Sequence, residues 1–298
     1  MSDKPFNYGG QAVLEGVMMR GSRAMAVAVR DPKGQIVTHV EPVNQRLYNG
    51  PISRIPFLRG LTMLWDALGL GIRSLMFSAD VAMGGEQQAS FGGPVAWGTV
   101  IISFAFGIGL FFVLPSLVIG LVDDWITSSL LSNVVEGLFR LLLFVGYVWL
   151  IGRMPDIRRV FAYHGAEHKT INAYEARAEL TPAAVQRFTT VHPRCGTAFL
   201  LSVVVISILL FSLLGRPSLA LRIVSRVALI PVIAGIAYEY IRFTARHMDK
   251  PWMRAIAAPN LAMQRLTTRP PDPQMLEVAI TAFNCMMGAE KASVVSNT

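Results

Sequence analysis

The chain has 298 residues, of which 53% are hydrophobic and 15% are charged, and its formal net charge is +8. Soluble domains carry about one quarter charged residues, so this balance excludes an ordinary soluble protein. The long apolar stretches exclude a disordered or collagen-like chain, and the two cysteines, far apart in the sequence, do not indicate a disulfide scaffold. We therefore expect an integral membrane protein.

Most of the basic residues fall in three blocks, 1–94, 153–195 and 242–298, whereas 123–133 contains two aspartates and no base. Because basic residues concentrate on the cytoplasmic side of membrane proteins, this pattern predicts that both termini are cytoplasmic. The start of the chain also lacks the apolar core of a signal peptide. We interpret the basic charge as attraction to anionic membrane lipids rather than to nucleic acid, since no cluster of bases interleaved with aromatics is present.

Residues 1–94 are expected to form a small cytoplasmic unit. The stretch MAVAVRDPKGQIVTHV alternates apolar and polar residues around Asp31-Pro32-Lys33-Gly34, which predicts a β-hairpin. Apolar residues then recur at helical spacing from Phe57 to Met83. This periodicity predicts an amphipathic helix, which either lies on the bilayer surface or is buried against the membrane helices.

The long apolar stretches within residues 95–245 predict a mainly α membrane protein with about four transmembrane helices. Pro115 lies inside the first span, where a neighbour has to satisfy the backbone carbonyl that proline frees. Glu136 and Arg140 lie four residues apart in the second span and are expected to form an ion pair. The expected spans are 95–122, 134–151, 196–214 and 223–241.

Residues 246–298 are expected to form a cytoplasmic tail that contains an amphipathic helix. Asp272 and Pro273 suit the first positions of that helix, and Gly288 is expected to end it.

The segment 153–195, an expected cytoplasmic lobe between the second and third spans, carries one motif with chemical meaning. His164 and His168 are one turn apart if the segment is helical, which allows both imidazoles to bind one ion. Glu167 lies three residues after His164 and is the candidate general base. The order His-x-x-Glu-His is that of the inverzincin metalloproteases, so the motif predicts a divalent metal, zinc in the first place.

A catalytic zinc needs a third protein ligand, and hydropathy places three donors at the same membrane depth. Glu239 is preferred, because a carboxylate within an apolar run is costly unless it is paired or bound to a metal; an ion pair with Arg242 is the alternative. His192 and Cys195 are the other candidates. Together with the motif they would complete a closed site with a structural ion, and Cys195 is also a conceivable nucleophile.

Several stretches together resemble the YqhQ-like bacterial membrane proteins, a family of unknown function whose members are predicted metal-dependent enzymes. The similarity runs through GGQAVLEGVMMRG, YHGAEHKTINAYE, HPRCGTAFL, YEYIR and LTTRPPDPQMLEVAI, and so covers nearly the whole chain. It implies a protein of the bacterial cytoplasmic membrane with a metal site at His164, Glu167 and His168.

Two functions follow as hypotheses. The first is a metal-dependent hydrolase at the cytoplasmic membrane face, with Glu167 as base and His164, His168 and Glu239 as ligands, acting on a lipid-linked substrate or a membrane peptide. The second is a membrane scaffold or assembly factor without catalytic activity, with or without a structural metal, that binds a membrane protein or a second copy of itself. A transporter is less favoured, because the ionisable residues of the expected spans lie near the span ends.

Overall fold

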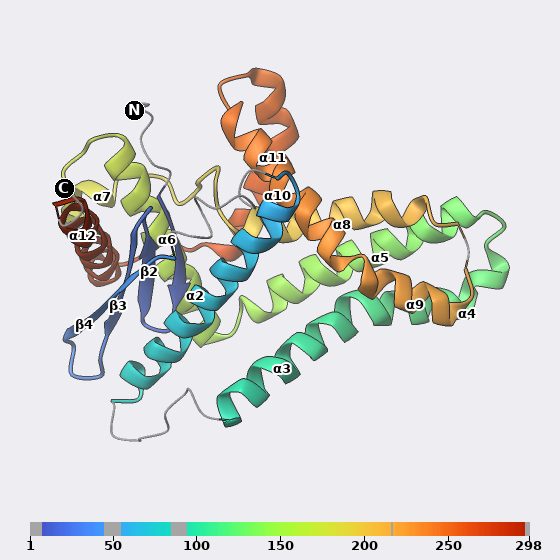
Figure 1. The fold of residues 1–298 in the computed structure, drawn as a ribbon, viewed down its shortest axis with the longest axis horizontal. Coiled ribbons are helices and arrows are strands. Elements are labelled where there is room, and N and C mark those ends of the chain that lie inside the picture. Colours follow the sequence, from blue (N-terminus) through green and yellow to red (C-terminus); the bar gives the residue numbers. More distant parts are fainter. Residues whose placement is uncertain (1–7, 45–54, 85–93, 216, 296–298) are drawn as a thin grey trace.

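The computed structural model describes residues 8–44, 55–84, 94–215 and 217–295. A bundle of apolar helices forms one end of the molecule, and a lobe built around a small β-sheet forms the other (Figure 1). The mainly α fold with a small N-terminal β unit is therefore confirmed. We use the name sheet lobe for this sheet together with two helices, residues 155–175 and 273–295.

The sheet is antiparallel, and its strands follow one another in chain order. The predicted hairpin is confirmed, and its turn is held by the Asp31 carboxylate, which accepts hydrogen bonds from the backbone N–H groups of Lys33 (2.9 Å) and Gln35 (2.7 Å). The first two strands were not expected, because their tight turn contains no glycine or asparagine signal; Glu15 there adopts a positive φ of 50°. The strands are β1 (Gly9–Val13), β2 (Gly16–Arg20), β3 (Ala24–Arg30) and β4 (Ile36–Pro42).

Helices cover both faces of the sheet. Alternate residues of a strand point to opposite faces. One face packs against α6 (Pro155–Glu175) and α12 (Pro273–Val295), and the other packs against α2 (Leu58–Ala82), whose Leu70 is 2% exposed. The central strands are thus buried on both faces, which explains their continuous apolar sequence.

Helix α12 begins where the sequence predicts and ends later. The Asp272 carboxylate accepts the N–H of Met275 at 2.8 Å, as an N-cap does. Gly288 does not end the helix, because Glu290 in the following turn is held by the N–H of Arg23 at 2.5 Å. The sheet and α12 share one core, although the sequence assigned them to separate segments.

The expectation of four membrane spans is not supported, since two helices in the described part of the chain are long and apolar enough to cross a membrane. One is the continuous helix Trp97–Val122, and the other is α5 (Ser129–Ile151). The first includes most of α3 (Pro94–Ile108), the π-helical turn η2 (Gly109–Val113) and α4 (Leu114–Val122).

The other two expected spans are interrupted or short. Helices α9 (Leu219–Ala228) and α10 (Ile230–Arg246) are bent by 44° and make a third span only if the pair counts as one. Pro231 in the first turn of α10 has no N–H to continue the preceding helix. Helix α8 (Thr197–Ser212) has 16 residues, about 24 Å, which is less than the ~30 Å of a hydrocarbon core.

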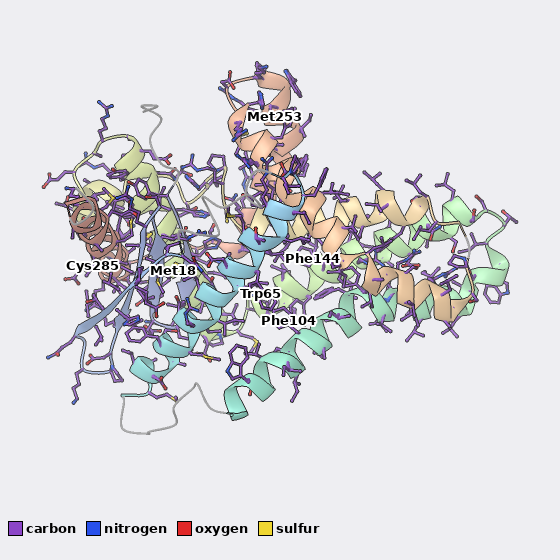
Figure 2. The ribbon with its side chains drawn as sticks, in the orientation of Figure 1. Met18, Trp65, Phe104, Phe144, Met253 and Cys285 are labelled. Atoms are coloured by element: carbon purple, nitrogen blue, oxygen red, sulfur yellow. The ribbon has the colours of Figure 1, made fainter. Side chains whose placement is uncertain are left out.

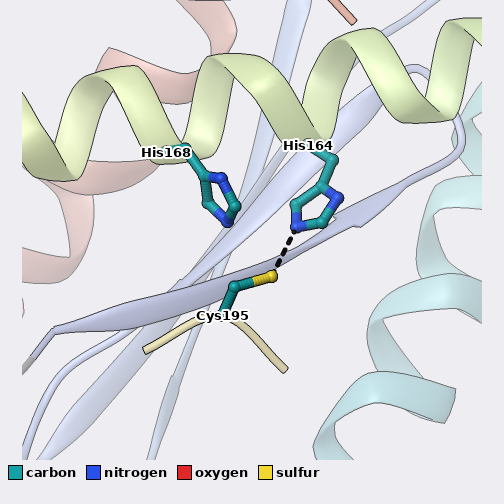
Figure 3. A group of neighbouring side chains, drawn as sticks. All are labelled: His164, His168 and Cys195. Atoms are coloured by element: carbon teal, nitrogen blue, oxygen red, sulfur yellow. Dashed lines mark hydrogen bonds between the residues drawn. The ribbon is translucent and has the colours of Figure 1, made fainter. Parts of the chain in front are cut away.

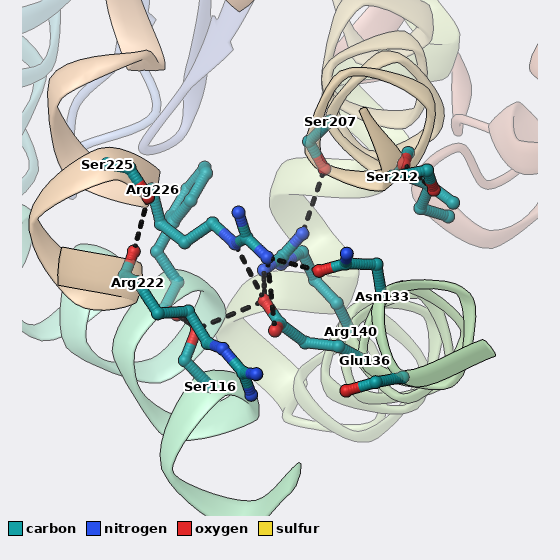
Figure 4. Close-up of polar contacts among 12 residues, drawn as sticks. Ser116, Asn133, Glu136, Arg140, Ser207, Ser212, Arg222, Ser225 and Arg226 are labelled. Atoms are coloured by element: carbon teal, nitrogen blue, oxygen red, sulfur yellow. Dashed lines mark hydrogen bonds and ion pairs between the residues drawn. The ribbon is translucent and has the colours of Figure 1, made fainter. Parts of the chain in front are cut away.

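Buried charges hold the bundle together (Figure 4). Pro115 leaves the carbonyl of Phe111 without its helical donor, and Arg140 Nε donates to this oxygen at 2.8 Å. The expected pair is present, with Arg140 Nη2 at 2.7 Å from Glu136 Oε1, and Arg226 joins it at 3.1 Å. The polar groups in the bundle therefore have a structural role that the sequence partly predicts.

Large apolar side chains cover the outside of the bundle and one face of α2 (Figure 2). Phe104 on α3 is 49% exposed, and Trp65 on α2 is 78% exposed. Helix α2 thus has one face buried against the sheet and α10 and another that is apolar and exposed, which confirms an amphipathic helix; its place on a bilayer surface stays a prediction.

Three further helices complete the fold: η3 (Asp123–Trp125), α7 (Pro182–Val185) and α11 (Pro251–Thr267). Helix α7 is the short helix predicted after Thr181, whose hydroxyl caps it by accepting the N–H of Ala184 at 3.4 Å. Helices η3 and α11 were not expected.

Candidate metal centre

Helix α6 carries the His-x-x-Glu-His motif, as predicted. It begins at Pro155, whose fixed φ suits the first turn of a helix. His164 and His168 lie one turn apart on the same face, with ring centroids 4.4 Å from each other. The helix therefore presents both imidazoles to one point.

Each imidazole is oriented by a backbone carbonyl. Nδ1–H of His164 donates to the carbonyl of Thr267 at 2.9 Å, and Nδ1–H of His168 donates to that of Thr190 at 2.6 Å. Because a carbonyl can only accept, these bonds fix the tautomers and leave both Nε2 lone pairs available to a cation. Backbone acceptors of this kind leave no trace in the sequence.

Cys195 supplies the third donor (Figure 3). Its Sγ lies 3.2 Å from Nε2 of His164, and the ligand atoms of Cys195, His164 and His168 all lie within 4.8 Å of one another. Nε2 of His168 is buried and has no hydrogen-bond partner among the described residues. The Thr197 hydroxyl (3.1 Å) and N–H (3.4 Å) also contact the sulfur, which would offset the negative charge of a thiolate ligand.

His192 lies beside this group but faces other partners. Its Nε2 is 3.7 Å from Glu175 Oε2 and 3.3 Å from Arg194 Nη2. Burial lowers the pKa of the imidazole, and Glu175 opposes that shift. The side chain of Gln264 fixes the backbone of His192: Oε1 accepts the His192 N–H at 2.9 Å, and Nε2 donates to the His192 carbonyl at 2.8 Å. His192 therefore is not one of the three grouped donors.

Glu239, the preferred third ligand in the sequence analysis, is placed elsewhere. Its carboxylate binds the guanidinium of Arg59, with Oε1 at 2.6 Å from Nε, and also contacts the N–H of Phe57. The expected cost of a carboxylate in an apolar run is offset by an arginine of α2 rather than by a metal. We therefore replace Glu239 by Cys195 as the third donor.

Glu167 borders the group and is 5% exposed. Its Oε2 lies 4.0 Å from Nε2 of His164. Burial raises the pKa of Glu167 to about 7, while His164 and the N–H of Gly10 act in the opposite direction. A Cβ at Gly10 would lie 3.0 Å from Glu167 Cγ and 2.4 Å from the carbonyl oxygen of Met18, so only glycine fits beside this carboxylate.

Lys169 holds the loop that orients His168. Its Nζ donates to the carbonyls of Gln186 (2.6 Å) and Phe188 (2.5 Å). These bonds fix the segment that ends at Thr190, whose carbonyl accepts from His168.

A cavity of about 230 Å³ opens next to the three donors. It lies between strands β1 and β2, helix α2, helix α6 and the segment before α8. Its charged and polar lining comprises Gln11, Arg20, His164, Glu167, His192, Arg194 and Cys195. Glu167 and two of the three grouped donors, His164 and Cys195, therefore line a space that admits a small molecule or part of a larger one.

Comparison with known proteins agrees with the sequence motifs. Residues 55–289 match the profile described as "Protein of unknown function (DUF1385)". The chain belongs to the DUF1385 family. A relative in this family, the uncharacterized protein YqhQ of Bacillus subtilis (strain 168), is 34% identical over 301 residues, covering 97% of this chain and 95% of the relative. No solved structure matches the chain. The resemblance to YqhQ-like proteins is thus confirmed.

Proposed function

We propose that this DUF1385 protein is a metal-dependent hydrolase of the cytoplasmic membrane. His164, His168 and Cys195 would hold a divalent ion, zinc in the first place, and Glu167 would be the general base. The substrate would be lipid-linked or a membrane peptide, because the cavity is lined by α2, which carries an exposed apolar face. Both termini would be cytoplasmic.

The observation that carries this proposal is the state of His168 Nε2. The imidazole is 1% exposed, its Nδ1 is engaged by Thr190, and its Nε2 has no hydrogen-bond partner among the described residues. A buried polar atom without a partner costs about 1–3 kcal/mol, and metal ligation removes that cost. Two imidazoles with a thiolate also combine the ligand types found in catalytic zinc sites, where the fourth position stays open.

The residues around the ion have separable tasks. A divalent ion in such a site lowers the pKa of water and polarises a carbonyl or phosphoryl oxygen. Glu167, which lines the cavity, would accept a proton from water and return it to a leaving group. The carbonyls of Thr190 and Thr267 keep both imidazoles in the ligating tautomer.

Metal analysis of the purified full-length protein tests the ligands. Wild type is expected to contain about one zinc, manganese or iron per chain, and His168→Ala and Cys195→Ala are expected to lose it. Glu239→Gln is the matched control and should keep the metal. Absence of metal from the wild type, or full metal content in His168→Ala, would contradict the proposal.

A scaffold with a structural metal is the second candidate, because thiolate ligands are frequent in structural zinc sites. Glu167→Gln separates the two functions. A catalytic base is worth about 10²–10⁴-fold in rate, so a hydrolase with this change would retain metal and fold but fail to complement a deletion strain. Full complementation by Glu167→Gln would favour the scaffold.

A further inference from the structure

Two arginines line the cavity beside the candidate metal centre. Arg20 ends strand β2, and Arg194 directly precedes the ligand Cys195. They are positioned by separate parts of the chain, yet both border the space that holds Glu167. The cavity thus combines cationic groups with the proposed reaction centre.

Each arginine is anchored by a carboxylate. Arg20 Nη2 lies 3.6 Å from Asp66 of α2, and Nη2 of Arg194 contacts Glu175 of α6. A guanidinium carries five N–H donors, and in Arg194 the contacts with Glu175 and His192 both use Nη2. In Arg194, Nε is buried without a hydrogen-bond partner among the described residues. This geometry suits an additional oxyanion, which arginine binds through paired hydrogen bonds.

Helix α2 separates this cavity from the apolar surroundings. Ala67 and Leu70 line the cavity, whereas Trp65 and Leu68 on another face of the same helix are 78% and 39% exposed. An exposed tryptophan on an amphipathic helix next to membrane helices is typical of the lipid–water interface. One helix therefore lines the cavity and also carries an exposed apolar face.

We propose that the cavity binds the phosphate-type head group of a membrane amphiphile, held by Arg194 and Arg20 next to the metal, with its apolar chain along α2. This inference rests on the proposed function and specifies its substrate class. Arg194 is a substrate-binding residue in this account. Glu167 activates the water that hydrolyses a bond next to the bound oxyanion, and returns the proton to the leaving group.

Cobalt-substituted full-length protein in neutral detergent micelles provides the test. The visible absorption of cobalt responds to ligands that enter the cavity, so inorganic phosphate and hexadecyl phosphate can each be titrated. We expect both to perturb the spectrum and hexadecyl phosphate to bind at least tenfold more tightly. Arg194→Gln should weaken both by about 10- to 100-fold, the range for a hydrogen bond to a charged group.

Two further variants keep the result interpretable. Arg194→Lys retains the charge without the fork of donors, so its affinity should lie between those of wild type and Arg194→Gln. Arg187→Gln removes an exposed arginine that does not line the cavity and should match the wild type. An unchanged cobalt spectrum without phosphate shows that each variant still forms the centre.

The outcomes distinguish the two proposals. A wild-type spectrum that phosphate does not alter, or equal affinities in Arg194→Gln and wild type, would overturn the oxyanion site and leave the metal centre intact. Equal affinities for inorganic and hexadecyl phosphate would overturn the membrane origin of the ligand. Failure to bind cobalt would overturn the proposed function, and this inference with it.

Discussion

At the scale of single residues, Gly10 and Glu167 show how closely the site depends on its packing. The side chain of Glu167 lies against the backbone of β1 and accepts the N–H of Gly10. Neither contact follows from the motif, because the two residues are 157 positions apart. The sheet therefore determines where the carboxylate can sit.

We predict that Gly10→Ala destabilises the protein and impairs its function. The new Cβ would lie 2.4 Å from the carbonyl oxygen of Met18 and 3.0 Å from Glu167 Cγ, so strand or side chain has to move. Overpacking of this kind costs about 1–3 kcal/mol. Thermal unfolding in detergent and complementation of a deletion strain measure the two effects. Gly9→Ala is the control, since its Cβ meets nothing within 4 Å; equal behaviour of the two variants would contradict this account.

The sequence predicts part of the site, and the reason is local spacing. His164, Glu167 and His168 share one helix, so a period of 3.6 residues brings them together. Cys195 was one of three candidates for the third donor, and the apolar surroundings of Glu239 favoured a residue that the structure places away from the two histidines. The partner that neutralises Glu239 is Arg59, 180 residues away, and sequence spacing gives no access to such a pair.

At the scale of elements, the helix Trp97–Val122 and α5 depend on each other. Pro115 frees the carbonyl of Phe111, and Arg140 of α5 satisfies that oxygen while it also pairs with Glu136. The sequence predicted the ion pair, because its members are four residues apart. The sequence also predicted that some neighbouring group would satisfy the carbonyl freed by Pro115, but it did not identify Arg140 of α5 as that group.

We predict that Arg140→Met costs less stability when Pro115→Ala is also present. The alanine introduced by Pro115→Ala has an N–H that can reach the Phe111 carbonyl, so the oxygen no longer needs Arg140. The single change Arg140→Met should cost about 3 kcal/mol or more, because it breaks a buried pair. A double-mutant cycle on unfolding in detergent should show a coupling of about 1 kcal/mol. Additive effects would indicate that the carbonyl contact contributes nothing.

Secondary structure was predictable where periodicity, a cap or a turn signal was clear, as in α2, the start of α12 and the β3–β4 hairpin. The prediction failed where the sequence had no local signal or where a tertiary contact outweighed that signal. The β1–β2 turn uses Glu15 at positive φ, and Gly288 remains helical because Glu290 ties the following turn to the sheet lobe. The apolar run 223–241 contained a proline, and the structure bends there.

At the scale of the whole molecule, the shared core of the sheet lobe constrains the membrane topology. Strands β1–β4, helix α6 and helix α12 pack together, so we expect all three parts of the chain to lie on one side of a membrane that the apolar helices cross. In this topology the chain enters the apolar bundle and returns between 84 and 155, and again between 195 and 273. This pairing holds whether or not the short helix α8 crosses the entire bilayer.

We predict that reporters fused to the N-terminus and the C-terminus lie on the same, cytoplasmic side. A fluorescent protein that folds only in the cytoplasm should be active at both ends, and a periplasm-dependent phosphatase should be inactive at both. A reporter placed after Trp125, in the loop before α5, should give the reverse pattern. Opposite results at the two termini would be incompatible with the shared core.

X-ray absorption spectroscopy of the zinc-loaded protein tests the metal centre most directly. The account predicts two imidazole nitrogens at about 2.0–2.1 Å and one sulfur at about 2.3 Å from zinc, with a light atom completing four ligands. Cys195→Ser should remove the sulfur shell, and Cys285→Ser should leave it unchanged. A shell without sulfur in the wild type, or one with sulfur that survives Cys195→Ser, would contradict the centre formed by His164, His168 and Cys195.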